Sequence, residues 1–168
     1  EEAKVTKSMG PKDLPKLPYR KNVGIMLLNN INMVFVGQRV DNHVNAWQMP
    51  QGGIDKSENA EDAAFRELEE ETGIPKALVE IVAVSNDWLT YDLPVEIIPK
   101  IWKGRFRGQK QKWFLMRFCG SDEQINIKTS HPEFAAWKWI IISELEDSIV
   151  EFKKAVYRKV IEEFKCYL

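Results

Sequence analysis

The sequence predicts an α/β domain in which a mixed β-sheet lies between helices. Short apolar runs typical of strands recur along the chain, for example at 23–28 and 113–118. Two segments, 59–73 and 151–164, carry helical signals. The two kinds of element follow one another in irregular order, which favours a mixed sheet over a regular parallel one.

The first part of the chain differs from the rest. Residues 1–18 are polar, contain three prolines and show no strand or helix period. We expect a flexible arm at 1–18 and one folded domain at 19–168, because this length is enough to bury a sizeable core.

The first predicted elements form a hairpin and an extended piece. The apolar runs 23–28 and 33–36 flank an Asn29-Asn30 turn signal. Residues 47–50 follow as a short extended segment, ended by Pro50 before a Gly52-Gly53 pair.

The clearest predicted helix comes next. Asn59 is placed to cap its start, with Asp62 three residues later as the partner of a capping box. Gly73 supplies the stop signal and Pro75 follows it.

The rest of the chain predicts three strands and a last helix. We expect strands at 78–84, 113–118 and 134–142, and a helix at 151–164. One face of that helix repeats an apolar residue every four positions, at Val156, Val160 and Phe164. Residues 85–112 show little regular pattern, which in a compact domain indicates a functional or mobile segment.

Composition excludes several classes of protein. Apolar residues make up 44% and charged residues 29% of the chain, and the net charge is −1. The apolar runs are far shorter than the roughly 18 residues of a membrane span. Cys119 and Cys166 have neither zinc-site nor disulfide-framework spacing. We expect a cytoplasmic protein with no membrane or DNA partner.

Three glutamates of the first helix predict chemistry. Glu67, Glu70 and Glu71 stand at i, i+3 and i+4, so a helix places them on one face. Crowded carboxylates repel one another, and divalent cations that prefer oxygen ligands, such as Mg²⁺, relieve that repulsion. Gly52-Gly53 allows backbone to approach a ligand closely.

A charge pair supports the same interpretation. Arg66 lies eight residues after Glu58, a spacing at which it can tie the preceding loop to the helix by a two-donor ion pair. The alternative, a solvated acidic helix face, explains neither this pair nor the glycines.

The segment 52–74 resembles the Nudix hydrolase motif at every fixed position. The resemblance implies the Nudix fold, an α/β/α sandwich with a mixed sheet. It also implies that the Gly52 carbonyl, Glu67, Glu70 and Glu71 surround two or three Mg²⁺ ions, for which Mn²⁺ or Zn²⁺ can substitute. The remaining motif positions are structural: Gly53, Glu58, Arg66 and Gly73.

The resemblance extends to one subgroup. The blocks 19–24, 47–53, 86–89, 108–114 and 132–134 are similar to those of bacterial RNA pyrophosphohydrolases and of the related dinucleoside polyphosphate hydrolases. A departure is Lys21, where many members have Pro. By this resemblance, Glu133 is a further metal ligand or base, not a solvated loop residue. Glu70, Glu71 and Glu133 stay open as the general base.

The resemblance also implies a substrate site. Arg39 and Phe152 would sandwich a nucleobase with Val150 alongside, although Phe152 also fits core packing of the last helix. Tyr91 is placed to donate a hydrogen bond. The groups that would reach phosphates are Arg20, Gln109, Gln111, Lys112 and Lys153.

A basic segment agrees with a phosphate-rich substrate. Residues 100–112 contain six cations and no acid. Four of them are candidates to neutralise a phosphate chain, unless the segment is an ordinary charged loop: Arg105, Arg107, Lys110 and Lys112.

These observations predict hydrolysis of the 5′-triphosphate end of RNA, leaving a 5′-monophosphate and so starting mRNA decay. The first alternative is the same chemistry on dinucleoside polyphosphates, such as diadenosine tetra- or pentaphosphate. A hydrolase of free nucleotides and a non-catalytic RNA-binding domain are further alternatives. The sequence identifies no stimulating protein partner.

Overall fold

The computed structural model describes residues 16–41 and 45–168. Most of the predicted arm therefore lies outside the described residues. Of its last residues, Leu17 packs against the core, and the Pro18 carbonyl accepts a hydrogen bond from the Arg107 backbone N–H at 3.1 Å. Among the described residues, no helix is both long enough and apolar enough to cross a membrane.

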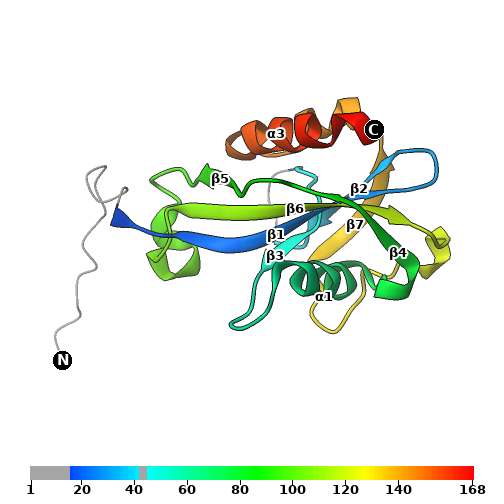
Figure 1. Ribbon diagram of the computed structural model, residues 1–168. Helices are drawn as coiled ribbons and strands as arrows, with labels where there is room; N and C mark the ends of the chain where they lie inside the picture. Colours follow the sequence, from blue (N-terminus) through cyan, green and yellow to red (C-terminus); the bar gives the residue numbers. More distant parts are fainter. Residues whose placement is uncertain (1–15, 42–44) are drawn as a thin grey trace.

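The described part of the chain folds as a seven-stranded mixed sheet between helices, which confirms the predicted fold class (Figure 1). The main strand order is β4-β6-β1-β2-β7; β3 pairs with β1, and β5 pairs with β6. The central β1–β6 pair is parallel and the other pairs are antiparallel. The strands are β1 (Tyr19–Leu28), β2 (Val34–Arg39), β3 (Gln51–Gly53), β4 (Val79–Val84), β5 (Leu89–Asp92), β6 (Gly108–Phe118) and β7 (Phe134–Ile140).

The helices cover opposite faces of this sheet. They are α1 (Ala60–Thr72), the short α2 (Leu145–Ser148) and α3 (Lys154–Phe164). Figure 1 shows α1 below the sheet and α3 above it. Side chains of β1 alternate between the two layers: Ile25 and Leu27 pack with the α1 side, whereas Met26 and Leu28 pack with the α3 side. Because both faces are covered, β1 reads as a continuous apolar run.

Both ends of α1 lie where the sequence predicts, although only the Asn59 half of the predicted capping box forms within the described residues. The Asn59 side chain accepts a hydrogen bond from the Asp62 backbone N–H at 2.8 Å. Gly73 ends the helix with φ 73°, and its N–H donates to the Glu69 carbonyl. A side chain at Gly73 would also lie 2.7 Å from the Asn126 carbonyl oxygen, so glycine is required there twice over.

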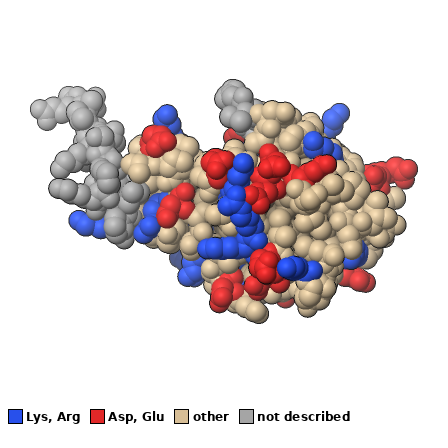
Figure 2. Space-filling model, turned by 90° about the horizontal axis from the view of Figure 1, so that it is seen from above, with Lys and Arg blue, Asp and Glu red and all other residues tan. Residues whose placement is uncertain are grey.

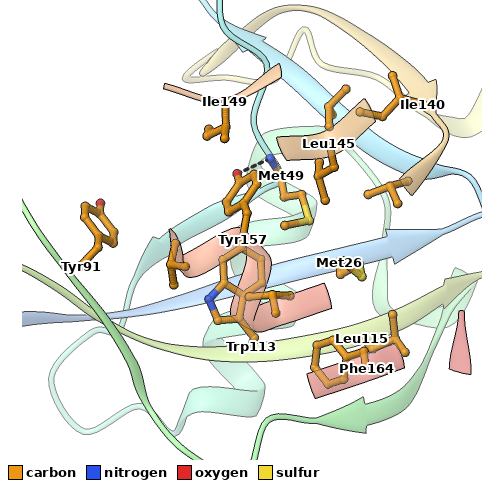
Figure 3. Close-up of a cluster of buried hydrophobic side chains, with 14 of the residues drawn as sticks. Met26, Met49, Tyr91, Trp113, Leu115, Ile140, Leu145, Ile149, Tyr157 and Phe164 are labelled. Atoms are coloured by element: carbon orange, nitrogen blue, oxygen red, sulfur yellow. Dashed lines mark hydrogen bonds between the residues drawn. The ribbon is translucent and has the colours of Figure 1, made fainter. Parts of the chain in front are cut away.

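A buried hydrogen bond joins α3 to the segment that precedes β3. The Tyr157 hydroxyl accepts a hydrogen bond from the Met49 backbone N–H at 2.9 Å, in the middle of the apolar cluster of Figure 3. The predicted apolar face of the last helix is confirmed: Val156, Val160 and Phe164 are all buried.

The main error concerns residues 85–112. They were expected to be irregular, but they contain β5 and the first half of β6. The polar residues Gln109 and Gln111 hid this strand, because they are buried through hydrogen bonds rather than apolar packing. The rest of the segment forms two 3-10 turns, Ile98–Lys100 and Trp102–Gly104.

Candidate functional site

In the described part of the chain, two adjoining cavities lie near the start of β1. The smaller has a volume of about 230 Å³ and the larger about 490 Å³. The smaller one contains the carboxylates Glu67, Glu71 and Glu133, and the larger one is lined by aromatic and aliphatic groups. The residues that line both are Arg39, Gln48, Gln51, Trp102 and Gln109.

The acidic residues of α1 differ in burial. Glu71 is 5% exposed, and the side chain of Glu67 is 13% exposed, whereas that of Glu70 is 58% exposed. Burial raises the pKa of Glu67 to about 7 and the pKa of Glu71 well above its ordinary value, and neighbouring carboxylates add to both effects. Two carboxyl groups are thus held where ionisation is costly without a cation.

The glycine pair of β3 makes room for functional groups. A Cβ atom at Gly52 would lie 1.9 Å from Cδ of Glu67, and one at Gly53 would lie 2.3 Å from Nη2 of Arg20. Each glycine therefore accommodates a different charged side chain of the protein itself, and the expected close approach to a ligand stays a prediction.

Arg66 joins the loop, the glycine pair and the helix. Its Nε and Nη2 donate to the two carboxylate oxygens of Glu58, both at 2.9 Å, which confirms the predicted two-donor pair. Nη2 also donates to the Gly53 carbonyl at 2.9 Å. Nη1 donates to Glu67 at 3.0 Å and to Glu70 at 3.2 Å. The bonds from Arg66 to Glu58 are the main cause that lowers the pKa of this carboxyl to about 2.

The oxygen-rich donor set is of the kind that binds hard divalent cations. Glu67, Glu71 and Glu133 line the smaller cavity together with Gly52, but Glu70 lines neither cavity and instead contacts Arg66. In residues 16–41 and 45–168, no three His, Cys, Asp or Glu side chains form a group that could hold a metal ion as they stand. The carboxylates fit a cation in chemistry and burial. Arg66 holds those of Glu67 and Glu70, whereas Glu71 accepts a hydrogen bond from the Gln51 backbone N–H at 3.4 Å.

The larger cavity collects residues expected around the nucleobase: Arg39, Tyr91, Val150 and Phe152 all line it. Lys153, which was expected to reach phosphates, lines the same cavity. The rings of Tyr91 and Phe152 lie 5.9 Å apart, at 40° to one another. Phe152 also packs against the buried cluster under α3, so the core role and the cavity role apply together.

Two cations of this cavity are held in different ways. Arg39 donates from Nε and Nη2 to the two oxygens of Asp41, both at 2.9 Å, which fixes the plane of its guanidinium. Lys153 is buried, with its Nζ 5.7 Å from the centroid of the Tyr91 ring. Burial lowers the pKa of Lys153 to about 8, with repulsion from Arg39 as the next cause.

Arg20 and Gln109 form a link between the cavities. Arg20 donates to the Gln109 side-chain oxygen at 3.4 Å and lies 5.1 Å from the centroid of the Trp102 ring. The Gln109 amide nitrogen donates in turn to the Tyr91 hydroxyl at 2.6 Å. Because that hydroxyl oxygen already accepts this bond, its own hydrogen is available to donate.

Two other residues that were expected to bind phosphates, Gln111 and Lys112, do not line either cavity. Gln111 lines neither cavity, and its amide is used in a buried network of hydrogen bonds. Lys112 also lines neither cavity, and its Nζ donates to the Asn86 carbonyl at 3.2 Å.

Most cations of the basic segment 100–112, which are candidates to neutralise phosphates, lie away from the two cavities. Arg105, Arg107, Lys110 and Lys112 do not line either cavity. Arg107 pairs with Asp92 at 2.8 Å, and Lys110 lies over the Trp88 ring. Among the cations of this segment, Lys100 lines the larger cavity.

Lys, Arg, Asp and Glu side chains are mixed on the surface that carries α3. In Figure 2 a row of Lys and Arg side chains crosses the middle of this face, with acidic side chains on both sides. Arg158 of α3 pairs with Glu146 in this way. The two signs are interspersed, in agreement with the small net charge.

Several wall residues were missed by sequence reasoning. Asn22 and Gln51 carried a weak signal, because each is a polar residue beside an apolar or glycine-rich strand segment. Trp102 carried none, since its position depends on a turn in which residues 102–104 all have left-handed φ, at 48°, 58° and 69°. The polar or aromatic wall residues that were missed are Asn22, Asp41, Gln48, Gln51, Lys100 and Trp102.

Comparison with known proteins agrees with this geometry. A relative from Roseobacter denitrificans called RNA pyrophosphohydrolase is 56% identical over 160 residues, covering 95% of this chain and 100% of the relative. One of the same name from Sphingopyxis alaskensis is 57% identical over 152 residues, covering 90% and 96%.

Solved structures show the same fold at low identity. The E. coli dihydroneopterin triphosphate pyrophosphohydrolase superposes with a TM-score of 0.69 at 19% identity, covering 90% of this chain and 99% of that one. The C. elegans Ap4A hydrolase binary complex gives 0.61 at 18% identity, covering 88% and 99%. A family model described as the NUDIX domain matches residues 18–164, and the chain therefore belongs to the NUDIX family.

Proposed function

We propose that this NUDIX hydrolase removes pyrophosphate from the 5′-triphosphate end of RNA and leaves a 5′-monophosphate. The observation that carries the proposal is the junction of a carboxylate-lined cavity with a larger cavity that has the size and lining of a nucleoside site. The relatives called RNA pyrophosphohydrolase, which match nearly the whole chain at over 50% identity, support the RNA substrate.

NUDIX hydrolases require a divalent cation. We propose two or three Mg²⁺ ions, with Mn²⁺ or Zn²⁺ able to replace them, near the Gly52 carbonyl and the carboxylates of Glu67, Glu71 and Glu133. Glu70 joins this set when its carboxylate turns from Arg66. When bound, the cations supply charge neutralisation at the phosphates and activate water.

The protein groups then have separate tasks. Arg66 keeps the loop and α1 in register through Glu58 and Gly53. The Arg20 guanidinium at the wall of the smaller cavity and the Lys153 ammonium stabilise negative charge on the phosphates. A carboxylate among Glu70, Glu71 and Glu133 accepts the proton of the attacking water.

The larger cavity would hold one nucleobase of the RNA. The Arg39 guanidinium, fixed by Asp41, and the Phe152 ring offer two flat surfaces for stacking, with Val150 beside them. The Tyr91 hydroxyl is free to donate a hydrogen bond to the base or sugar. We also propose that the protein acts in the cytoplasm, because Cys119 and Cys166 are both free thiols, as is usual in a reducing compartment.

Initial rates with Mg²⁺ test the proposal. A 5′-triphosphorylated RNA oligomer is compared with diadenosine tetraphosphate and with free nucleoside triphosphates, and we expect the RNA to have the highest kcat/KM. A clear preference for diadenosine tetraphosphate would instead support the dinucleoside polyphosphate alternative. Glu70→Gln should lose about 10²–10³ in kcat, whereas Glu69→Gln, on another face of α1, should not. Equal activity of the two variants would refute the assignment of Glu70.

A further inference from the structure

A row of buried amides crosses three strands beside the smaller cavity. Asn22 of β1 lies opposite Gln111 of β6 in the parallel pair, and Gln51 of β3 pairs with the β1 residue Gly24. These three amide side chains are at most 9% exposed. The Gln111 amide nitrogen donates to both neighbours, to Asn22 Oδ1 and to Gln51 Oε1, each at 2.9 Å.

The indole of Trp113 fixes which way the Gln111 amide points. The indole N–H can only donate, and it lies 3.2 Å from the Gln111 side-chain oxygen. The ring itself cannot move, because it is fully buried, packs edge-on against Tyr157 and covers the backbone of Gly24. The Gln111 oxygen must therefore face the indole, and both hydrogens of its amide nitrogen must face Asn22 and Gln51.

The orientation of the Gln111 amide also fixes the orientations of Asn22 and Gln51 in the cavity wall. Asn22 and Gln51 each turn an oxygen toward Gln111, so each amide nitrogen points away from it. Within the described residues, neither of these nitrogens makes a hydrogen bond, and neither is sealed off as a buried unpaired atom. Both side chains line the smaller cavity, whereas Gln111 does not.

We propose that Trp113 and Gln111 are positioning residues that force Asn22 and Gln51 to present N–H donors to the phosphates of the substrate. The relay turns two amides, each of which could show either an oxygen or an NH₂ group, into fixed donors for an anion. It rests on the proposed function in placing phosphates in the smaller cavity. It also reassigns Gln111, which the family resemblance had placed on the phosphates directly.

Side-chain NH₂ signals in ¹⁵N–¹H spectra test the orientation directly. The probe is methylenediphosphonate with Mg²⁺, a diphosphate analogue with a P–C–P link that cannot be hydrolysed. We expect the NH₂ signals of Asn22 and Gln51 to shift on titration, while the Gln111 signals stay in place. Shifts of the Gln111 signals without those of its two neighbours would overturn the relay.

Gln111→Glu breaks the relay without touching the cavity wall. A carboxylate accepts from the Trp113 indole but cannot donate to Asn22 and Gln51, so their NH₂ groups turn inward. We expect the Kd for the probe to rise about tenfold or more, the scale of one lost hydrogen bond to a charged group. A folded variant with unchanged Kd would contradict the proposal.

If the Gln111→Glu variant does not fold, Trp113→Phe provides a second test of the relay. It removes the obligate donor and lets Gln111 reverse, so we expect a several-fold weaker Kd. Trp139→Phe is the matched control, because that indole donates to Asp122 and lines neither cavity. Equal Kd values for the two Trp variants would reject the relay. Probe binding needs no turnover, so a failure of RNA hydrolysis with intact probe binding would count against the proposed function alone.

Discussion

Alanine at Gly52 and alanine at Gly53 should damage different steps of the reaction. Neither glycine has a positive φ, so the backbone of β3 accepts alanine at both positions. The added methyl group meets Glu67 in the first variant and Arg20 in the second, at 1.9 Å and 2.3 Å from the nearest atom. Two neighbouring substitutions therefore displace two different side chains: the Glu67 carboxylate, which is proposed to bind the cation, and the Arg20 guanidinium, which is proposed to bind phosphate.

The expected magnitudes follow from the atoms that are displaced. In Gly52→Ala the Glu67 carboxylate swings away, and kcat should fall by about 10²–10³, as for loss of one electrostatic group. In Gly53→Ala the Arg20 guanidinium moves, and KM should rise about tenfold to a hundredfold, as for one lost bond to a charged group. Both displaced atoms are ends of flexible side chains, so the free energy of unfolding should change by less than about 1 kcal/mol.

Steady-state kinetics with triphosphorylated RNA and thermal unfolding of each variant provide the assay. Gly24→Ala is the contrasting variant, because its methyl group meets the buried Trp113 ring at 2.5 Å. It should lower stability by about 1–3 kcal/mol through overpacking. If Gly52→Ala instead raised KM with kcat unchanged, the close approach of Gly52 and Glu67 would have no catalytic meaning.

Three further predictions follow from single contacts. Arg66→Lys should lower both kcat and stability, the latter by about 2 kcal/mol, because an ammonium group cannot keep both bonds to Glu58; a variant as stable as the wild type would contradict this. The Lys153 ammonium carries its proton below pH 8, so the affinity for the diphosphate analogue should fall as pH rises through about 8, and Lys153→Gln should flatten that profile in calorimetric titrations. Tyr157→Phe leaves the buried Met49 N–H without an acceptor and should cost about 1–3 kcal/mol in urea unfolding, with KM unchanged.

The elements that the sequence predicts well are those with local signals. The α1 helix has its cap residue and its stop glycine within one short segment, and both behave as predicted. The Arg66–Glu58 pair is also local, since eight residues along the chain fix its geometry. The apolar repeat of α3 is confirmed for the same reason.

The parts that escaped prediction depend on contacts between distant segments. The first half of β6 looks irregular because Gln109 and Gln111 are buried by amides and hydroxyls that come from other strands. Asp92 lies 15 residues before Arg107 and holds that cation away from the cavities, which no charge count could reveal. Trp102 reaches the shared wall only through three consecutive left-handed residues.

The parallel pairing of β1 with β6 has a consequence for how the protein is made. Ten residue pairs join these strands, from Tyr19 with Gly108 to Leu28 with Arg117. A growing chain exposes the apolar β1 long before its partner has been synthesised, because about ninety residues must follow first. The glutamates of α1 are complete early, but the meeting of Arg20 with Gln109 requires the later strand. An unfinished nascent chain therefore carries the acidic motif without a substrate cavity, and the enzyme cannot act on RNA until the ribosome has released most of its length.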